Sequence, residues 1–488
     1  MNATTMRHAD LSTLERQVEN DLKQIAHPHL PWVLPHRGPD GAPMLDVLII
    51  GAGQSGITAA FGLQRDRIDN VLVIDQAPYG KEGPWSTYAR MHTLRNPKDY
   101  TGPDLDVPSL TCQSWFEAVY GAAAWEALEI VSKDDWAAYL LWVRKMTGVR
   151  VENDTALVAL DPVGIPVAPD AVDGMSDQVF AATLRTDAGT RIVHARKIVL
   201  ATGQESMGRW TLPHVIEALP AACRARAADP IDFAALRGRR VVVIGAGASA
   251  FDNAGAALEA GASDVKLLCR RMAAQVVQPY RWLTFRGFLR HFSALDDAWR
   301  WRFMNHVFQL REGFTQATYD RCIAHDTFDV VTGAELHGAQ LRDGAVHLQT
   351  AAGDLVADFV ICAIGIEIDV SRRPELAAAA GNIATWGDRY TPPDDEKNPR
   401  MGGFPYLNDD YSFAEKVPGL TPWLRNVHLF SIASTVSFGP SGSSINALTT
   451  AIPKLVTGVG RGLFCDDVER YWRSLNDYDV PQAVLRSR

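Results

Sequence analysis

Short, nearly continuous apolar runs recur along this chain, and several end at small or acidic residues. Runs without strict apolar–polar alternation are typical of parallel strands that are covered on both faces. The runs lie at 46–50, 71–74, 197–200, 240–244, 264–269, 355–362 and 426–432. Residues 150–160 and 179–200 alternate and also predict strands, with a turn rich in Pro, Asp and Gly at 161–178. We therefore expect an α/β fold whose sheets are mainly parallel, with right-handed crossovers.

Helical spacing of apolar residues marks several segments outside these strands. Residues 11–25, 115–121 and 132–147 show it. In the last of these segments one face carries Trp136, Tyr139, Leu140 and Val143. Such a stripe predicts packing in the core.

Two segments after residue 278 have an unusual composition. Residues 279–308 combine aromatic and basic side chains, and we expect helices that pack between domains. An alternative stays open, in which some of them line a substrate site and an arginine binds a carboxylate. Residues 388–406 are rich in Pro, Asp and Gly and predict a mobile surface loop.

The run at 46–50 leads into a glycine turn and a helix. Gly51 allows the tight turn, Gly53 lets a pyrophosphate approach the backbone, and Gly56 lets helix pack on strand. The pyrophosphate would lie at the helix N-terminus. The next strand ends in an acid that can bind a ribose hydroxyl. We predict a dinucleotide site with contacts from Gly51, Gly53, Gln54, Ser55, Gly56, Asp75 and Gln76.

The run at 240–244 repeats this design, with alanine in the place of the third glycine. The strand that follows ends in two arginines rather than an acid. Guanidinium groups bind a 2′-phosphate that a carboxylate would repel, so the second nucleotide is predicted to be NADPH. The alternative is that both arginines are surface charges. The predicted contacts are Gly245, Gly247, Ala248, Ser249, Ala250, Arg270 and Arg271.

Two dinucleotide sites in one chain predict two cofactors that meet. The site that ends in Asp75 suits FAD, and hydride transfer from NADPH requires nicotinamide and flavin to lie face to face. Other strand ends and turns complete the predicted cofactor contacts: Gly83, Trp85, Val158, Ala201, Thr202, Gly203, Ile364, Gly365, Ser443, Ser444 and Ile445. We expect Ser443 or Ser444 to cap a helix that runs to about Val459, whose N-terminus would stabilise charge on reduced flavin.

Composition and charge narrow the class of protein. The 488 residues are 47% hydrophobic and 22% charged, as in soluble globular proteins of two or three domains. A net charge of −9 does not suggest a nucleic-acid or anionic-membrane partner. The six cysteines are scattered without a C-x-x-C pair, which argues for a reducing compartment and against metal sites or a redox-active disulfide. No signal-peptide core or membrane-spanning run is evident, so we expect a cytoplasmic enzyme. A homo-oligomer is a possible assembly.

The order of the motifs predicts how the domains are arranged. Flavin-side segments flank the second glycine motif, so the NADPH domain is predicted to be inserted into the FAD domain. We expect an N-terminal arm at 1–44, two parts of the FAD domain at 45–210 and 366–488, and an inserted NADPH domain at 211–365 that includes the aromatic segment.

Together these motifs resemble one family, the NADPH-dependent single-component (class B) flavoprotein monooxygenases, which comprise flavin-containing, Baeyer–Villiger and N-hydroxylating enzymes. The resemblance covers about residues 45–465. It rests on both glycine motifs, on Gly83-Pro84-Trp85 and on Ala201-Thr202-Gly203. It implies tightly bound FAD, reduction by NADPH, and reaction with O2 to a C4a-(hydro)peroxide that oxygenates a small-molecule substrate.

The resemblance also implies candidate catalytic residues in one loop. Residues 91–98 look like the stretch that places a polar side chain near the flavin and oxygen in these enzymes. The candidates are His92, Arg95, Asn96 and Lys98, with His92 or Arg95 nearest the peroxide, and His92 is also a predicted cofactor contact. They would hydrogen-bond the peroxide and the nicotinamide rather than form a covalent intermediate.

One departure bears on the reaction. The Phe-x-Gly-x-x-x-His signature of the Baeyer–Villiger and flavin-containing members is not present, and Arg226 stands about where its His is expected. We therefore favour N-oxygenation of a small amine or amino acid, whose carboxylate Lys98, Arg286 or Arg290 would bind. A flavin reductase, dehydrogenase or oxidase without oxygenated product stays open, as does a non-catalytic flavin-binding sensor.

Overall fold

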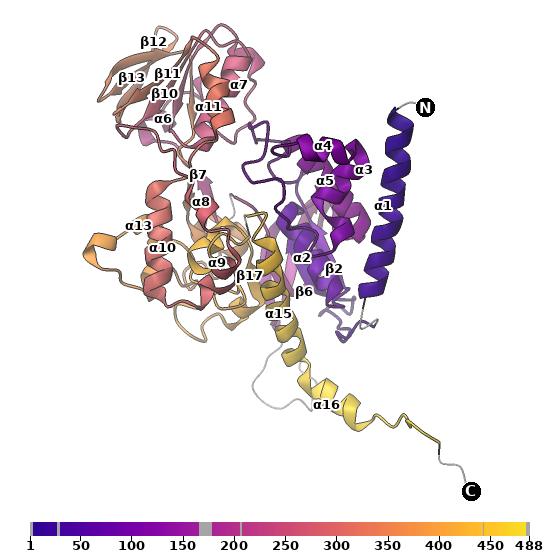
Figure 1. Ribbon diagram of the computed structural model, residues 1–488. Helices are drawn as coiled ribbons and strands as arrows, with labels where there is room; N and C mark the ends of the chain where they lie inside the picture. Colours follow the sequence, from indigo (N-terminus) through magenta and orange to yellow (C-terminus); the bar gives the residue numbers. More distant parts are fainter. Residues whose placement is uncertain (1–2, 27–29, 165–177, 205–206, 443, 485–488) are drawn as a thin grey trace.

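The computed structural model describes residues 3–26, 30–164, 178–204, 207–442 and 444–484, and these form two lobes (Figure 1). The larger lobe contains both termini, and the smaller lobe contains β8 to β15 with helices α6, α7 and α11. Each lobe is built around a sheet with parallel strands, so the predicted α/β fold is confirmed. Within the described residues, no helix is long and apolar enough to cross a bilayer.

The larger lobe has a seven-stranded sheet in the order β3-β2-β1-β6-β5-β4, with β17 also paired to β6. The pairs among β3, β2, β1, β6 and β17 are parallel, and β4-β5-β6 is an antiparallel meander. The segments predicted as strands at 150–160 and 179–200 each contain two strands. The strands are β1 (Leu45–Ile50), β2 (Val71–Ile74), β3 (Val151–Glu152), β4 (Ala156–Gly164), β5 (Gln178–Thr186), β6 (Gly189–Leu200) and β17 (Val427–Leu429).

Helices surround this sheet, and all of them except α16 bury apolar side chains in the larger lobe. The predicted stripe on α5 is confirmed as core, because Trp136, Tyr139, Leu140 and Val143 are all buried. The helices of this part are α1 (Ala3–Ile25), α2 (Gln54–Arg65), α3 (Cys112–Tyr120), α4 (Ala122–Ala127), α5 (Lys133–Thr147), α14 (Thr435–Phe438), α15 (Leu448–Asp466) and α16 (Val468–Asn476).

The smaller lobe has a fully parallel sheet in the order β11-β10-β9-β15-β8, beside a three-stranded antiparallel sheet β12-β13-β14. The run predicted as one strand at 355–362 contributes to both sheets, because the chain changes sheet at Asp358, whose carboxylate accepts from Arg240 N at 2.8 Å. The elements are α6 (His214–Glu217), β8 (Arg224–Arg226), β9 (Arg240–Ile244), α7 (Ala248–Glu259), β10 (Asp264–Cys269), α11 (Gln316–Ile323), β11 (Phe328–Thr332), β12 (Leu336–Arg342), β13 (Ala345–Thr350), β14 (Gly353–Ala357) and β15 (Phe359–Cys362).

The two connections between the lobes lie side by side. Strand β7 (Gly208–Trp210) leads toward the smaller lobe, and β16 (Ile366–Ile368) returns from it. They pair antiparallel, with Gly208 opposite Ile368. A side chain at Gly208 would overlap the carbonyl oxygen of Glu367, so glycine permits this close pairing.

The aromatic segment packs on the larger lobe, which corrects its predicted place in the NADPH domain. It forms α8 (Pro279–Trp282), α9 (Arg286–His291) and α10 (Asp297–Leu310), beside the larger lobe in Figure 1. Its buried side chains belong to the larger core and not to the cores of the smaller lobe: Leu283, Phe288, Phe292, Trp301, Met304 and Val307. With this change, the predicted domain limits stay a proposal.

The segment predicted as a mobile surface loop, 388–406, is mostly exposed up to Arg400, but it contains short helices and its end is buried. This segment includes α12 (Trp386–Arg389) at its start and α13 (Pro399–Gly402), and Met401 is fully buried. The carbonyl oxygen of Glu396 accepts from Trp301 Nε1 and Asn305 Nδ2, both at 2.9 Å. The composition is that of a loop, and α10 anchors it through the carbonyl oxygen of Glu396.

Candidate functional site

The first glycine turn joins β1 to α2 and has the geometry expected of a nucleotide site. Gly51 has φ +104°, and a Cβ on it would overlap the carbonyl oxygen of Ala201. A Cβ on Gly56 would overlap the carbonyl oxygen of Gly51. Both positions therefore require glycine for the fold itself.

Gly53 differs, because a side chain at this position would not clash with the protein. Its φ is −68°, which any residue adopts, and the nearest atom to an added Cβ is Gly83 Cα at 3.9 Å. Gly53 and Gly83 thus approach each other with room for a single methyl group between them. Helix α2 has no side-chain cap at Gly53, so the N–H groups at its start fit a pyrophosphate group of FAD.

Asp75 follows β2 and braces the glycine turn. Its carboxylate accepts from Ala52 N at 2.7 Å and from Ala77 N at 2.8 Å. Burial raises the pKa of this carboxyl. Thr155 N donates to the carbonyl oxygen of Asp75 at 2.9 Å, so the start of β4, and with it Val158, runs beside this strand end. Gln76 is exposed.

Buried polar atoms without partners lie among the predicted FAD contacts. Trp85 Nε1 and Thr202 Oγ1 are buried and have no hydrogen-bond partner among the described residues. Trp85 also lies edge-on to Trp136, whose Nε1 donates to Gln54 Oε1 at 3.3 Å. Unpaired buried donors are costly, and a polar cofactor would satisfy them. The residues of the first turn therefore fit FAD.

The segment before α15 reaches the same turn, but not through the expected helix cap. Ser55 Oγ donates to the carbonyl oxygen of Gly442 at 2.5 Å. Helix α15 begins at Leu448 after Ala447, which makes no side-chain cap, and continues to Asp466. The prediction that Ser444 caps this helix is therefore wrong, because a turn at 445–447 intervenes; Ser443 lies outside the described residues.

The second glycine turn repeats the first in detail. Gly245 has φ +121°, and a Cβ on it would overlap the carbonyl oxygen of Ala363, as at Gly51 and Ala201. Ala248, Ser249 and Ala250 form the first turn of α7. Gly247 is open except for the carbonyl oxygen of Glu312, 3.4 Å from an added Cβ. Ile364 and Gly365 follow β15 at the same edge of the sheet.

Arg270 and Arg271 follow β10 at this edge, and both are exposed. The guanidinium of Arg271 donates to the carbonyl oxygens of Gln309 and Leu310 at the end of α10. Burial and the charges of Arg400, Arg271 and Arg270 lower the pKa of Arg311 to about 10. Positive charge is therefore concentrated where a 2′-phosphate is predicted.

The loop with the candidate catalytic residues lies against the smaller lobe. Arg95 pairs with Asp252 at 2.5 Å and with Glu312 at 3.1 Å, and His92 Nε2 lies 3.4 Å from Glu259. Lys98 Nζ donates to the carbonyl oxygen of Trp125 at 2.6 Å. Asn96 is partly buried in the same loop.

These pairs show that the loop joins the lobes, and they leave the predicted catalytic roles untested. Sequence reasoning missed the partners on α7 and α11. Asp252 and Asn253 are two polar residues in a largely apolar helical segment, and both are buried. This polar pair was the feature of the sequence that could have indicated a contact there. Arg321 on α11 donates to the carbonyl oxygen of Arg90 at 2.9 Å and had no such signal.

A second set of missed residues joins three segments beside the loop. Tyr100 Oη lies 2.8 Å from Thr284 Oγ1, and Asn446 Nδ2 donates to the carbonyl oxygen of Thr284 at 3.0 Å. Gly102 lies against the carbonyl group of Ile445. The loop, the aromatic segment and the segment before α15 therefore meet at one place.

Comparisons with known proteins agree with this geometry. The family model described as pyridine nucleotide-disulphide oxidoreductase matches residues 45–385. A FAD-dependent urate hydroxylase from Xanthomonas campestris pv. campestris is 39% identical over 475 residues, 97% of each chain.

Solved structures with the same fold are more distant in sequence. An ornithine N-hydroxylase from Kutzneria sp. 744 has a TM-score of 0.63 at 17% identity, over 86% of this chain and 99% of that one. An ornithine hydroxylase from Pseudomonas aeruginosa has a TM-score of 0.65 at 14% identity, over 86% of this chain and 100% of that one. An L-lysine 6-monooxygenase from Pseudomonas syringae has a TM-score of 0.63 at 18% identity, over 86% of this chain and 99% of that one. The chain therefore belongs to the pyridine nucleotide-disulphide oxidoreductase family, and the predicted likeness to class B flavoprotein monooxygenases is confirmed.

Proposed function

We propose that this protein is an FAD-dependent monooxygenase that takes electrons from NADPH and hydroxylates urate or a closely similar purine. The observation that carries the substrate is the 39% identity to the urate hydroxylase across 97% of both chains. The N-hydroxylases at 14–18% identity support the fold alone.

The two glycine turns would hold the cofactors. The uncapped start of α2 at Gly53, with the unpaired Trp85 Nε1 and Thr202 Oγ1 nearby, would bind FAD. The turn at Gly245 would take NADPH, with its 2′-phosphate toward Arg270. When both are bound, NADPH supplies the hydride and reduced FAD supplies the electrons that activate O2. The chain itself binds, orients and shields these groups.

The meeting point of Tyr100, Thr284 and Asn446 is our candidate for substrate contact. Its hydroxyl and amide groups can exchange hydrogen bonds with the edge of a planar purine ring. It lies next to the segment before α15 that bonds the FAD turn through Ser55. Oxygenation would convert urate, O2, NADPH and a proton into hydroxylated urate, water and NADP+.

N-oxygenation of an amine or amino acid is our second candidate. This candidate requires a cation that binds the substrate carboxylate, and Lys98 was one of those predicted. The Lys98 ammonium instead donates hydrogen bonds to the carbonyl oxygens of Trp125 and Glu126. Arg286 and Arg290 are exposed. These placements favour the purine over the amino acid.

A disulfide reductase reaction has little support, despite the name of the family model. All six cysteines are free, and five of them are buried. Burial raises the pKa values of Cys112 and Cys362 to about 12, which keeps them as unreactive thiols.

The test is to give the purified protein FAD, NADPH and 18O2 with urate, or in parallel with L-ornithine or L-lysine. We expect NADPH consumption that urate stimulates, and one 18O atom in the product by mass spectrometry. Labelled product from the amino acids alone would establish the second candidate. NADPH oxidation that yields only hydrogen peroxide with every substrate would favour an oxidase and contradict our proposal.

A further inference from the structure

Residues 464–484 form an arm whose base is fixed to the larger lobe. The buried carboxylate of Asp467 pairs with Arg196 and with His36, both at 2.7 Å. Tyr471 Oη donates to the carbonyl oxygen of Trp32 at 2.7 Å, and its ring stacks on Phe464. The direction in which α16 leaves the lobe is therefore set by buried contacts.

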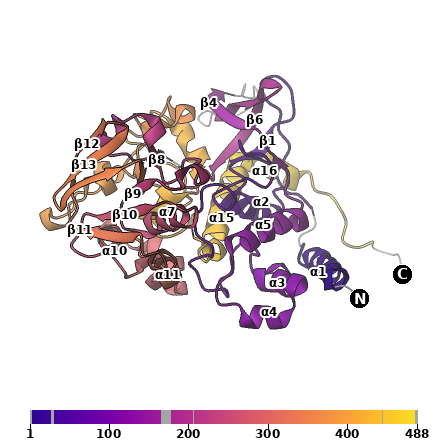
Figure 2. The ribbon, with the colours of Figure 1, turned by 90° about the horizontal axis from the view of Figure 1, so that it is seen from above.

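Beyond this base, the arm has no cover. Helix α16 buries none of its residues. Val468, Trp472 and Leu475 are 51%, 62% and 65% exposed, and their spacing places them on one face of the helix. Tyr478 and Val480 continue the exposed apolar surface at 67% and 62%. In both Figure 1 and Figure 2 the arm extends from the side of the molecule opposite to α10 and points away from it.

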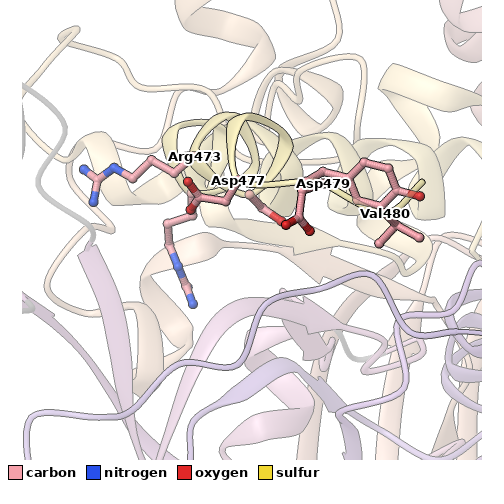
Figure 3. A pocket seen from close by; sticks show the side chains of 7 residues that line it. Arg473, Asp477, Asp479 and Val480 are labelled. Carbon is pink, nitrogen blue, oxygen red and sulfur yellow. The ribbon is translucent and has the colours of Figure 1, made fainter.

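The tip of the arm adds negative charge to this apolar surface. Asp477 and Asp479 alternate with Tyr478 and Val480, and they line a shallow pocket that also includes Arg470, Arg473 and Ser474. Figure 3 shows Asp477 and Asp479 side by side along the arm. This pocket lies on the arm and not at the strand ends of either sheet.

A complementary surface lies on the aromatic segment. Trp282, Phe285 and Trp299 are 59%, 51% and 48% exposed. The side chains of Arg281, Arg286 and Arg290 are exposed around them and form no ion pair with a described residue. We call these six residues the receiving surface. Exposed aromatic patches of this kind mark interaction sites, and aromatic and arginine side chains are enriched there.

We propose that the arm of one copy of this chain docks on the receiving surface of a second copy. The apolar face of α16 would cover the exposed aromatic rings, and Asp477 and Asp479 would pair with Arg286 and Arg290. Because the arm leads away from the receiving surface of its own chain, a second copy is the matching partner. Two such contacts related by a two-fold axis close into a dimer.

The first test measures mass by light scattering. We expect the wild-type protein at twice the chain mass of 53.5 kDa. The variant Trp472→Ser with Leu475→Ser should shift to one chain mass. The control Leu341→Ser, an exposed leucine on β12, should stay at the wild-type mass. A monomeric wild-type protein, or an arm variant that still dimerises, overturns the proposal.

A charge exchange identifies the docking surface. One variant carries Arg286→Glu and Arg290→Glu, and the other carries Asp477→Arg and Asp479→Arg. Each alone should be monomeric, since like charges would meet, and an equal mixture should dimerise because both contacts regain opposite charges. Monomers in the mixture, or dimers of either variant alone, would show that the arm does not dock there. All these residues are exposed, so unchanged thermal unfolding would verify that each variant is folded.

Discussion

Arg95 and Asp252 join the two lobes through a buried ion pair, with Arg95 Nη2 2.5 Å from Asp252 Oδ2. The two side chains are 20% and 3% exposed. Arg95 lies in the loop at 91–98, within the segment predicted to bind FAD, and Asp252 lies on α7, directly after the second glycine turn. The pair therefore helps to fix the smaller lobe against this loop.

Substitution of Arg95 should both destabilise the protein and slow its reduction. Arg95→Ala leaves a buried carboxylate without its cation, which costs roughly 3 to 5 kcal/mol of unfolding free energy. The double variant Arg95→Ala with Asp252→Asn should lose less, because no charge remains unpaired. Denaturant unfolding and rapid-mixing reduction by NADPH measure these effects.

The same variants distinguish two roles of Arg95, which are holding the two lobes together and contacting the reacting oxygen. If Arg95 acts by holding the lobes, Asp252→Asn alone should slow reduction by NADPH as Arg95→Ala does. If only Arg95→Ala raises the hydrogen peroxide released per NADPH, Arg95 touches the reacting oxygen, as the sequence predicted.

The two arginines after β10 should decide which nucleotide is used. We expect Arg270→Ala with Arg271→Ala to raise the KM for NADPH at least tenfold, on the order of one lost charge-assisted contact, with little change for NADH. Arg270→Ala alone should have most of this effect, since Arg271 bonds Gln309 and Leu310. Arg239→Ala, before β9 at the opposite edge of the sheet, is the control. Equal losses for both nucleotides would remove the phosphate contact.

Gly53→Ala should remove the cofactor and leave the fold intact. Its backbone accepts alanine, and an added Cβ meets no protein atom closer than 3.9 Å. It would project beside the start of α2, where we place the pyrophosphate. We expect FAD content, measured by absorbance after purification, to fall while apo-protein unfolding is unchanged. Gly381→Ala, where nothing lies within 4 Å, should retain FAD. Full FAD content in Gly53→Ala would exclude the start of α2 as the pyrophosphate site.

Asp46 should make stability depend on pH. Burial raises its pKa from 3.8 to about 6, and Arg196 and His36 offset part of this. Between these values the folded state binds more protons than the unfolded state, so stability falls as pH rises from about 4 to 6. Asp46→Asn should therefore gain up to about 3 kcal/mol at pH 7 and about half as much at pH 5.

Urea unfolding at both pH values tests this prediction, with the exposed Asp40→Asn as the control. The same gain at pH 5 and pH 7 would mean that the ionisation of Asp46 is not the cause.

What the sequence determined by itself was local in the chain. Each glycine turn lies within one strand–turn–helix unit, so Gly51, Gly56 and Gly245 were recognisable from spacing, and the structure shows why a side chain would not fit there. The parallel strands were recognisable from their apolar runs. These signals need no knowledge of distant residues.

What only the tertiary structure decided were contacts between distant parts of the chain. The partner of Arg95 is 157 positions away, and the segment around Glu396 is ordered by side chains of α10. The aromatic segment is inserted between strands of the smaller lobe, yet it packs on the larger one. Composition could not reveal these outcomes, because each depends on which surfaces the folded strands and helices bring together.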